Sequence, residues 1–300
     1  MITIKNMTKW RHIGTLLSCV VMLISIFTLA TKGLNYGLDF TGGMISEVRL
    51  DKTLTAKEIQ SHLETALNQP VSVVEAGDPG QWVLRYAAPE TLSAQPEIKT
   101  LLNGFSDNVE MLNVSLVGPQ VGQELAEQGG LAVLITLLVI LGYLSMRFEW
   151  RLASGALLAL VHDVVLLLGF FSFTGMEFNL TVLAALLAVL GYSLNDSIII
   201  SDRIRELLKA NVSLPIAELN NRAIVSTLSR TLITSGTTLI SVGSLWLLGG
   251  EPLYGFSITM FIGIVAGTWS TMTVATIIPE LTHLGPQHYA PAPAPVSDTP

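Results

Sequence analysis

The residue with the most evident chemistry is Asp196, which lies in an otherwise uncharged run from Asn179 to Ser201. The run is long enough to cross a bilayer, which takes about 20 helical residues. Carboxylates in such segments are costly and mark ion or proton pathways by default. Asn195 and Ser197 add further polarity. We therefore expect Asp196 to couple an ion; the alternative is a lone polar side chain that reaches the interface.

Arg230 is the expected partner of this carboxylate. It follows Arg222 by eight residues, which at about 1.5 Å per residue places it about 12 Å inside the membrane boundary. Asp196 precedes Asp202 by six residues and so lies about 9 Å inside the same boundary. A carboxylate withdrawn from water holds a proton more readily, and a nearby arginine opposes this. If the distance between Asp196 and Arg230 varies, movement of the helices is coupled to protonation of the carboxylate. If the distance is fixed, the two residues form a static pair.

Hydroxyl side chains recur around Arg230 at steps of four and three residues, which places them on one helical face. They are Thr227, Thr231, Thr234, Thr238 and Ser241. The stripe suits either a water-lined proton path or close packing between helices. A carboxylate near hydroxyls can take a proton or a sodium ion, so the coupling ion stays open.

A second carboxylate, Asp163, follows His162 in another apolar run. It lies twelve residues after Arg151 and therefore near the bilayer midplane. A histidine beside an aspartate can relay protons or form a static hydrogen-bonded pair. Both interpretations stay open.

Other chemistries lack their usual residues. The sequence has no Walker-type glycine loop, no cluster of Cys and His, and no serine in a nucleophile-elbow context. Its single cysteine, Cys19, excludes an intramolecular disulfide. We expect no enzyme, no metal and no cofactor other than a coupling proton or Na⁺.

The elements that position these residues are membrane spans. Half of the 300 residues are hydrophobic and 13% are charged, which is unlike a soluble chain. Six apolar stretches can each cross a bilayer. They run at about Ile13–Ala30, Leu131–Met146, Leu152–Phe173, Leu180–Ile200, Leu232–Leu248 and Leu253–Ile278.

Charge gives the orientation. Ten of the sixteen Lys and Arg residues lie on one side of this arrangement, which predicts a cytoplasmic side with both termini. The chain then divides into an N-terminus with the first span (1–34), an extracytoplasmic domain (35–128), five spans (129–285) with a cytoplasmic loop at about 202–230, and a disordered cytoplasmic tail (286–300). The domain at 35–128 carries 5 basic and 13 acidic residues, so its net charge of 5 minus 13, or −8, disfavours nucleic acid and anionic lipid headgroups.

Residues 35–128 carry the pattern of an α+β domain. Strands are expected at Gly43–Leu50, Val71–Glu75, Gln81–Tyr86 and Val109–Val117. One helix opens with the capping box Thr55–Glu58, and another has Pro96 in its first turn. The order βαββαβ predicts a ferredoxin-like fold.

Several motifs, in this order, resemble those of the SecF proteins in the SecD/SecF family. They are Gly37–Gly43 (GLDFTGG), Val117–Gly122, Phe148–Arg151, Gly191–Ser197 with Ser201–Glu206, and Arg230–Thr238. The resemblance covers about residues 10 to 285 and implies an RND-like half with six transmembrane helices. It also implies ion-coupling roles for Asp196 and Arg230.

This resemblance implies a subunit of the bacterial inner membrane that works with SecD beside the SecYEG channel, with YajC and YidC as further partners and its α+β domain in the periplasm. Such a subunit uses a proton or sodium gradient for the late translocation and release of unfolded polypeptides. The first motif either forms a tight turn or makes Gly37, Asp39, Gly42 and Gly43 a hinge that transmits motion to the domain.

Two other functions stay open. One is an assembly or scaffold subunit without ion flux, in which Asp196 and Arg230 form a static pair. The other is half of an RND-type small-molecule exporter, for which the α+β domain, at under 100 residues, is too small to hold an aromatic-lined substrate pocket.

Overall fold

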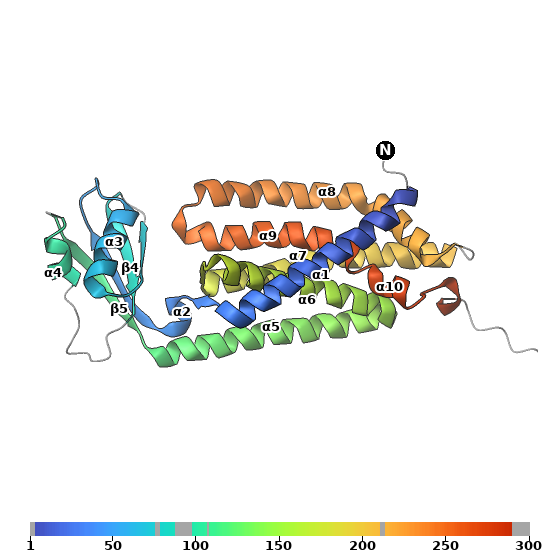
Figure 1. Ribbon diagram of the computed structural model, residues 1–300, viewed down its shortest axis with the longest axis horizontal. Helices are drawn as coiled ribbons and strands as arrows, with labels where there is room; N and C mark the ends of the chain where they lie inside the picture. Colours follow the sequence, from blue (N-terminus) through green and yellow to red (C-terminus); the bar gives the residue numbers. More distant parts are fainter. Residues whose placement is uncertain (1–3, 76–78, 88–97, 107, 211–213, 290–300) are drawn as a thin grey trace, which may run out of the picture.

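The computed structural model describes residues 4–75, 79–87, 98–106, 108–210 and 214–289. It has two parts, a bundle of long helices and an α/β domain at one end of the bundle (Figure 1). We call this end of the helices the domain-side end and the opposite one the far end.

Six helices are long and apolar enough to cross a membrane, as the sequence predicts. They are α1 (Ile4–Lys32), α5 (Pro119–Arg147), α6 (Trp150–Thr174), α7 (Leu180–Ala210), α8 (Ile216–Leu248) and α9 (Glu251–Thr273). Helices α6, α7 and α9 are the most buried, whereas α1, α5 and α8 expose apolar side chains along most of their length. The candidate functional residues on α6 and α7 therefore lie in the centre of the bundle.

Small residues allow the central helices to approach closely. A methyl group at Gly263 of α9 would overlap Val189 of α7, and one at Gly267 would lie 3.0 Å from Cβ of Ser193. Side chains at these two positions would push α9 away from α7. The spacing of Gly263 and Gly267 thus serves packing within this chain.

Some helix ends differ from the apolar stretches. Helix α7 continues beyond Ser201 to Ala210, and α8 begins at Ile216, so most of the 202–230 segment is helical. Helix α9 ends at Thr273, and a short helix, α10 (Ile277–Leu281), follows it; the sixth candidate span includes both and runs from Leu253 to Leu281. Pro286–His288, expected in a disordered tail, forms one 3₁₀ turn; the remaining tail residues, 290–300, lie outside the described part.

The far end is held together by a buried arginine. Arg11 of α1 donates to Oδ1 of Asn221 on α8 at 2.8 Å and to Oγ1 of Thr276 at 3.2 Å. It also forms an ion pair with Glu280 of α10. This residue connects three helices that are distant in the sequence.

The α/β domain has the predicted βαββαβ order. Its elements are β2 (Gly43–Arg49), α3 (Ala56–Leu67), β3 (Val71–Glu75), β4 (Gln81–Tyr86), α4 (Ile98–Asn103) and β5 (Glu110–Val117). The strand order β3-β4-β2-β5, with every pair antiparallel, confirms the ferredoxin-like fold. The capping box of α3 is present, and Pro96 lies outside the described residues.

Candidate functional site

Asp196 lies on the central helix α7 with 2% of its surface exposed. Its Oδ2 atom has no hydrogen-bond partner among the described residues, and the same holds for the hydroxyl of Ser197. Asn195 faces outward and is exposed. A buried carboxylate oxygen without a donor is costly in a protein interior.

Arg230 lies on α8 and is close enough to Asp196 to interact with it electrostatically. No direct ion pair joins the two side chains in the described part of the chain, and Arg230 is exposed on the bundle surface. The pair is therefore separated rather than locked. A charged guanidinium on a membrane-facing helix needs a covering partner or water.

The hydroxyl stripe on α8 runs from the bundle interior to its surface. Thr231 is buried, and its hydroxyl has no partner within the described segments. Thr234 donates to the carbonyl of Arg230 at 3.0 Å, and Thr238 donates to that of Thr234 at 2.9 Å, while Ser241 is exposed. These contacts within one helix leave both interpretations of the stripe open.

Asp163 is fully buried where α6, α7 and α9 meet. Its Oδ2 accepts hydrogen bonds from the hydroxyls of Ser193 at 2.6 Å and Ser270 at 3.0 Å. Its Oδ1 lies 3.1 Å from Nδ1 of His162. Asp163 thus has a full set of partners, unlike Asp196. Sequence reasoning missed the role of Ser270, which no local pattern indicates.

The segment between α1 and the α/β domain is attached to the start of α7. The short strand β1 (Asn35–Tyr36) pairs in parallel with β6 (Glu177–Phe178), which immediately precedes α7. Oδ2 of Asp39 accepts a hydrogen bond from the backbone N–H of Leu180, the first residue of α7, at 3.0 Å. A single helix therefore carries both the Asp39 contact and Asp196, about 24 Å apart at 1.5 Å per residue.

The Gly37–Gly43 motif forms a one-turn helix, α2 (Leu38–Thr41), rather than a simple tight turn. Gly37 donates its N–H to the carbonyl of Phe178 at 2.9 Å, and Gly42 ends α2 with a positive φ of 73°. Gly43 begins β2, where a side chain would meet the carbonyl of Tyr86 at 2.7 Å. The glycines allow tight docking, and their role as a hinge stays a prediction.

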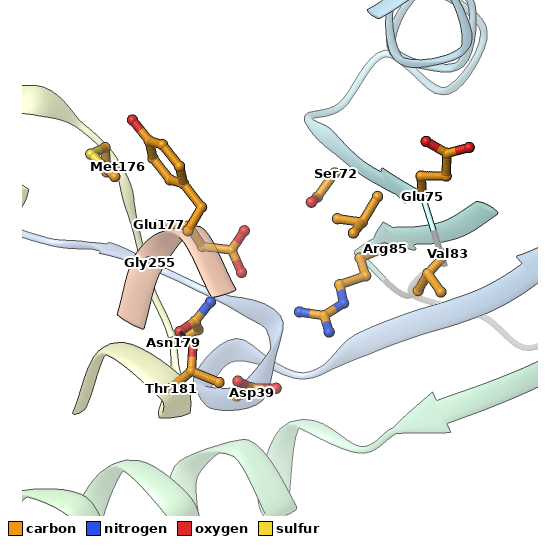
Figure 2. Close-up of a pocket in the computed structure, with 12 residues that line it drawn as sticks. Asp39, Ser72, Glu75, Val83, Arg85, Met176, Glu177, Asn179, Thr181 and Gly255 are labelled. Atoms are coloured by element: carbon orange, nitrogen blue, oxygen red, sulfur yellow. Dashed lines mark hydrogen bonds between the residues drawn. The ribbon is translucent and has the colours of Figure 1, made fainter. Parts of the chain in front are cut away.

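A cleft of about 480 Å³ separates the β3 and β4 strands of the α/β domain from the bundle. Figure 2 shows Arg85 reaching from β4 into this space toward Asp39 and Asn179. Nε of Arg85 is buried and has no hydrogen-bond partner in the described structure. No cluster of three or more His, Cys, Asp or Glu residues that could hold a metal ion occurs in the described ranges.

Comparisons with known proteins agree with these features. Residues 97–283 match the family "Protein export membrane protein SecD/SecF, C-terminal", and residues 27–54 match the "SecD/SecF GG Motif". The chain is 42% identical over 288 residues to protein translocase subunit SecF of Vibrio alginolyticus, covering 94% of this chain and 91% of that protein. It is 38% identical to the same subunit of Haemophilus influenzae, covering 94% and 87%.

Two solved structures are also similar. SecDF from Thermus thermophilus, described as a translocon-associated membrane protein, matches with a TM-score of 0.78 and 34% identity. SecDF in a super-membrane-facing form matches with a TM-score of 0.69 and 33% identity. The two matches cover 91% and 93% of this chain, but this chain spans only 38% of the length of either SecDF chain.

Proposed function

The chain belongs to the SecD/SecF family of protein export membrane proteins, and we propose on this premise that it uses an ion gradient to promote late protein translocation across the bacterial inner membrane. Its relatives are protein translocase subunits, which supports a transport role rather than an enzymatic one. The coupling ion is H⁺ or Na⁺, and the translocating polypeptide is the cargo.

The observation that carries this proposal is the state of Asp196. Its buried Oδ2 has no donor among the described residues, yet Arg230 acts on it electrostatically from the neighbouring helix. Binding of a cation or proton would neutralise Asp196 and weaken its attraction to Arg230. The relative position of α7 and α8 would then depend on the occupancy of this one group.

Helix α7 is the element that would transmit such a change. Asp39 and the β1–β6 pairing attach the base of the α/β domain to the first turn of α7. A shift of α7 would therefore move this base, and the cleft beside Arg85 gives the domain space to follow. Asp163 is the second candidate for ion coupling, since the loss or gain of its proton would disturb three helices at once.

SecD is the proposed partner of this chain. SecDF structures continue well beyond the 38% of their length that this chain matches, so we assign the complementary half to SecD. SecD would cover exposed Arg230. SecYEG, and beyond it YajC and YidC, would complete the assembly, with the α/β domain in the periplasm and both termini in the cytoplasm.

A double substitution separates this function from a static scaffold. In cells depleted of the native protein, Asp196→Asn combined with Arg230→Gln should abolish the gradient-dependent export of a secreted reporter, because neither group could respond to the ion. Co-purification with SecD controls for assembly. Normal export of the reporter by the double variant would support the scaffold function instead. Export of a small toxic compound by the wild-type protein would support the exporter function.

A further inference from the structure

The far end of α7 is held by the turn between α5 and α6, where the motif Phe148–Arg151 lies. Oδ2 of Asp202 on α7 accepts a hydrogen bond from Arg147 at 2.8 Å, and Oδ1 forms an ion pair with Arg205 at 2.9 Å. Arg205 also donates to the carbonyl of Arg147 at 3.3 Å, and its guanidinium lies 5.7 Å from the centre of the Phe148 ring. One arginine of α7 thus contacts a carboxylate, a backbone carbonyl and an aromatic ring.

The C-terminal segment (Leu284–Tyr289) packs against the same place. Leu284 is 1% exposed, and the Tyr289 ring packs against the same hydrophobic core as Phe148. Nζ of Lys209, near the end of α7, lies 5.9 Å from the centre of the Tyr289 ring, within the range of a cation–π contact. Glu149 of the turn acts on the Tyr289 hydroxyl electrostatically. The segment therefore contacts both α7 and the turn.

We call these contacts the far-end anchor; its members are Arg147, Phe148, Asp202, Arg205 and Tyr289. The middle of α7 is held differently. Ser193 donates to Asp163 at 2.6 Å, and Tyr192 donates to Ser235 at 3.4 Å. Each of these contacts depends on a single hydroxyl, which can rotate to follow a small shift, whereas the anchor combines charged groups with two aromatic rings.

We propose that the far-end anchor fixes one end of α7 as a pivot, so that a displacement at Asp196 is passed to the opposite end of the helix. This inference rests on the proposed function, in which ion occupancy of Asp196 shifts α7. The helix is continuous from Leu180 to Ala210. Asp196 lies nine residues from Arg205 and Leu180 lies 25 residues from it, or about 14 Å and about 38 Å at 1.5 Å per residue. A tilt about the anchor would therefore move Leu180, which Asp39 contacts, about 2.7 times as far as Asp196.

Hydrogen exchange tests the anchor by itself, in the full chain purified with its membrane partner. Arg205→Met removes the three contacts of this side chain and should speed exchange in the last two turns of α7 about tenfold. Tyr289→Ala should also speed it. Tyr289→Phe keeps the ring and should not, because the hydroxyl has no hydrogen-bond partner in the described chain.

Arg222→Met is the matched control for the loss of a surface arginine, because Arg222 pairs with Glu218 within α8; it should leave exchange in α7 unchanged. Wild-type exchange in Arg205→Met, or equal exchange in Tyr289→Ala and Tyr289→Phe, would overturn the anchor.

Two spin-label pairs then test the pivot, in a background that carries Cys19→Ser. Met146→Cys with Glu206→Cys spans the far end, and Thr174→Cys with Thr181→Cys spans the domain-side end; all four positions are exposed. The first residue of each pair lies on α5 or α6, and the second lies on α7.

Asp196→Asn imitates the neutralised carboxylate. It should shift the distance across the domain-side pair and leave the far-end pair unchanged, and adding Arg205→Met should let the far-end pair move as well. A larger shift at the far end than at the domain-side end, with the anchor intact, would overturn the pivot. No shift in either pair would also overturn it, and the exchange rates would then show whether the anchor or the ion-dependent movement of the proposed function is at fault.

Discussion

Replacing Asp39 with alanine removes the acceptor that holds the first backbone N–H of α7. In the native chain Oδ2 of Asp39 lies 3.0 Å from N of Leu180, across 141 residues of sequence. Helix N-termini leave such N–H groups without partners inside the helix. The substitution should therefore loosen the start of α7 and detach it from the base of the α/β domain.

The size of the effect follows from known helix caps. Loss of a side-chain acceptor at a helix N-terminus costs about 0.5–2 kcal/mol, and a carboxylate at the positive end of the helix dipole accounts for about 0.3–1 kcal/mol of favourable interaction. Since about 1.4 kcal/mol corresponds to a factor of ten, the amide of Leu180 should exchange its hydrogen about tenfold faster in Asp39→Ala. Asp39→Asn, which keeps an acceptor, should show a smaller change.

Asn179→Ala is the matched control, because Asn179 directly precedes α7 and caps it locally: its Oδ1 accepts a hydrogen bond from the N–H of Val182 at 3.0 Å. This cap does not involve the α/β domain. The substitution should also speed exchange in the first turn. Spin labels at Ser72 and Thr181, on opposite sides of the cleft in a background without Cys19, would report the domain position. Their distance distribution should broaden in Asp39→Ala but not in Asn179→Ala; equal distributions in all three proteins would refute the tether.

Three further predictions concern stability. Gly122→Ala should lower it by about 1–3 kcal/mol, because the new methyl carbon would lie 2.6 Å from a backbone carbonyl of α2; Gly130→Ala on the same helix, with no atom within 4 Å, should leave the melting temperature unchanged or higher. Burial raises the pKa of the Tyr86 hydroxyl above its ordinary 10.0. The protonated hydroxyl therefore makes its full contribution to folding stability below pH 10.0, and this contribution is lost as the pH rises through the folded-state pKa. The melting temperature of the α/β domain should fall with rising pH in this range in wild type, and should fall less in Tyr86→Phe. Arg11→Met should destabilise the chain by about 1–3 kcal/mol, because it removes the ion pair with the partly buried Glu280, while Nε2 of His12 stays 3.5 Å from that carboxylate. Adding Glu280→Met should recover part of that loss in a double-mutant cycle.

Periodic and compositional features made much of the fold predictable. Hydropathy located all six spans, and alternation with turn residues located the four strands of the sheet. Hydropathy reports the membrane boundary rather than the helix end, so it missed the extension of α7 to Ala210. There Arg203 and Glu206, three residues apart, form an ion pair on the helix after the apolar run has ended.

Contacts between distant residues were not predictable. The β1–β6 pairing involves two residues per strand, too few to produce a pattern, and Ser270 meets Asp163 only because α9 packs against α6 and α7. Counting residues along helices predicted that Asp196 and Arg230 lie at a similar depth, and this stays a prediction. The same count could not predict the exposure of Arg230, because exposure depends on which faces of α8 this chain itself covers.

The most direct test of ion coupling at Asp196 is the export rate of a secreted reporter in cells depleted of the native protein. Wild type, Asp196→Asn and Asp196→Glu are compared at matched membrane levels, with the proton or sodium gradient intact or collapsed. We expect Asp196→Asn to lose the gradient-dependent part of export while the complex stays assembled, and Asp196→Glu, which keeps a titratable carboxylate, to retain some of it. Wild-type export by Asp196→Asn would show that Asp196 is structural and that any coupling lies elsewhere, with Asp163 the next residue to test.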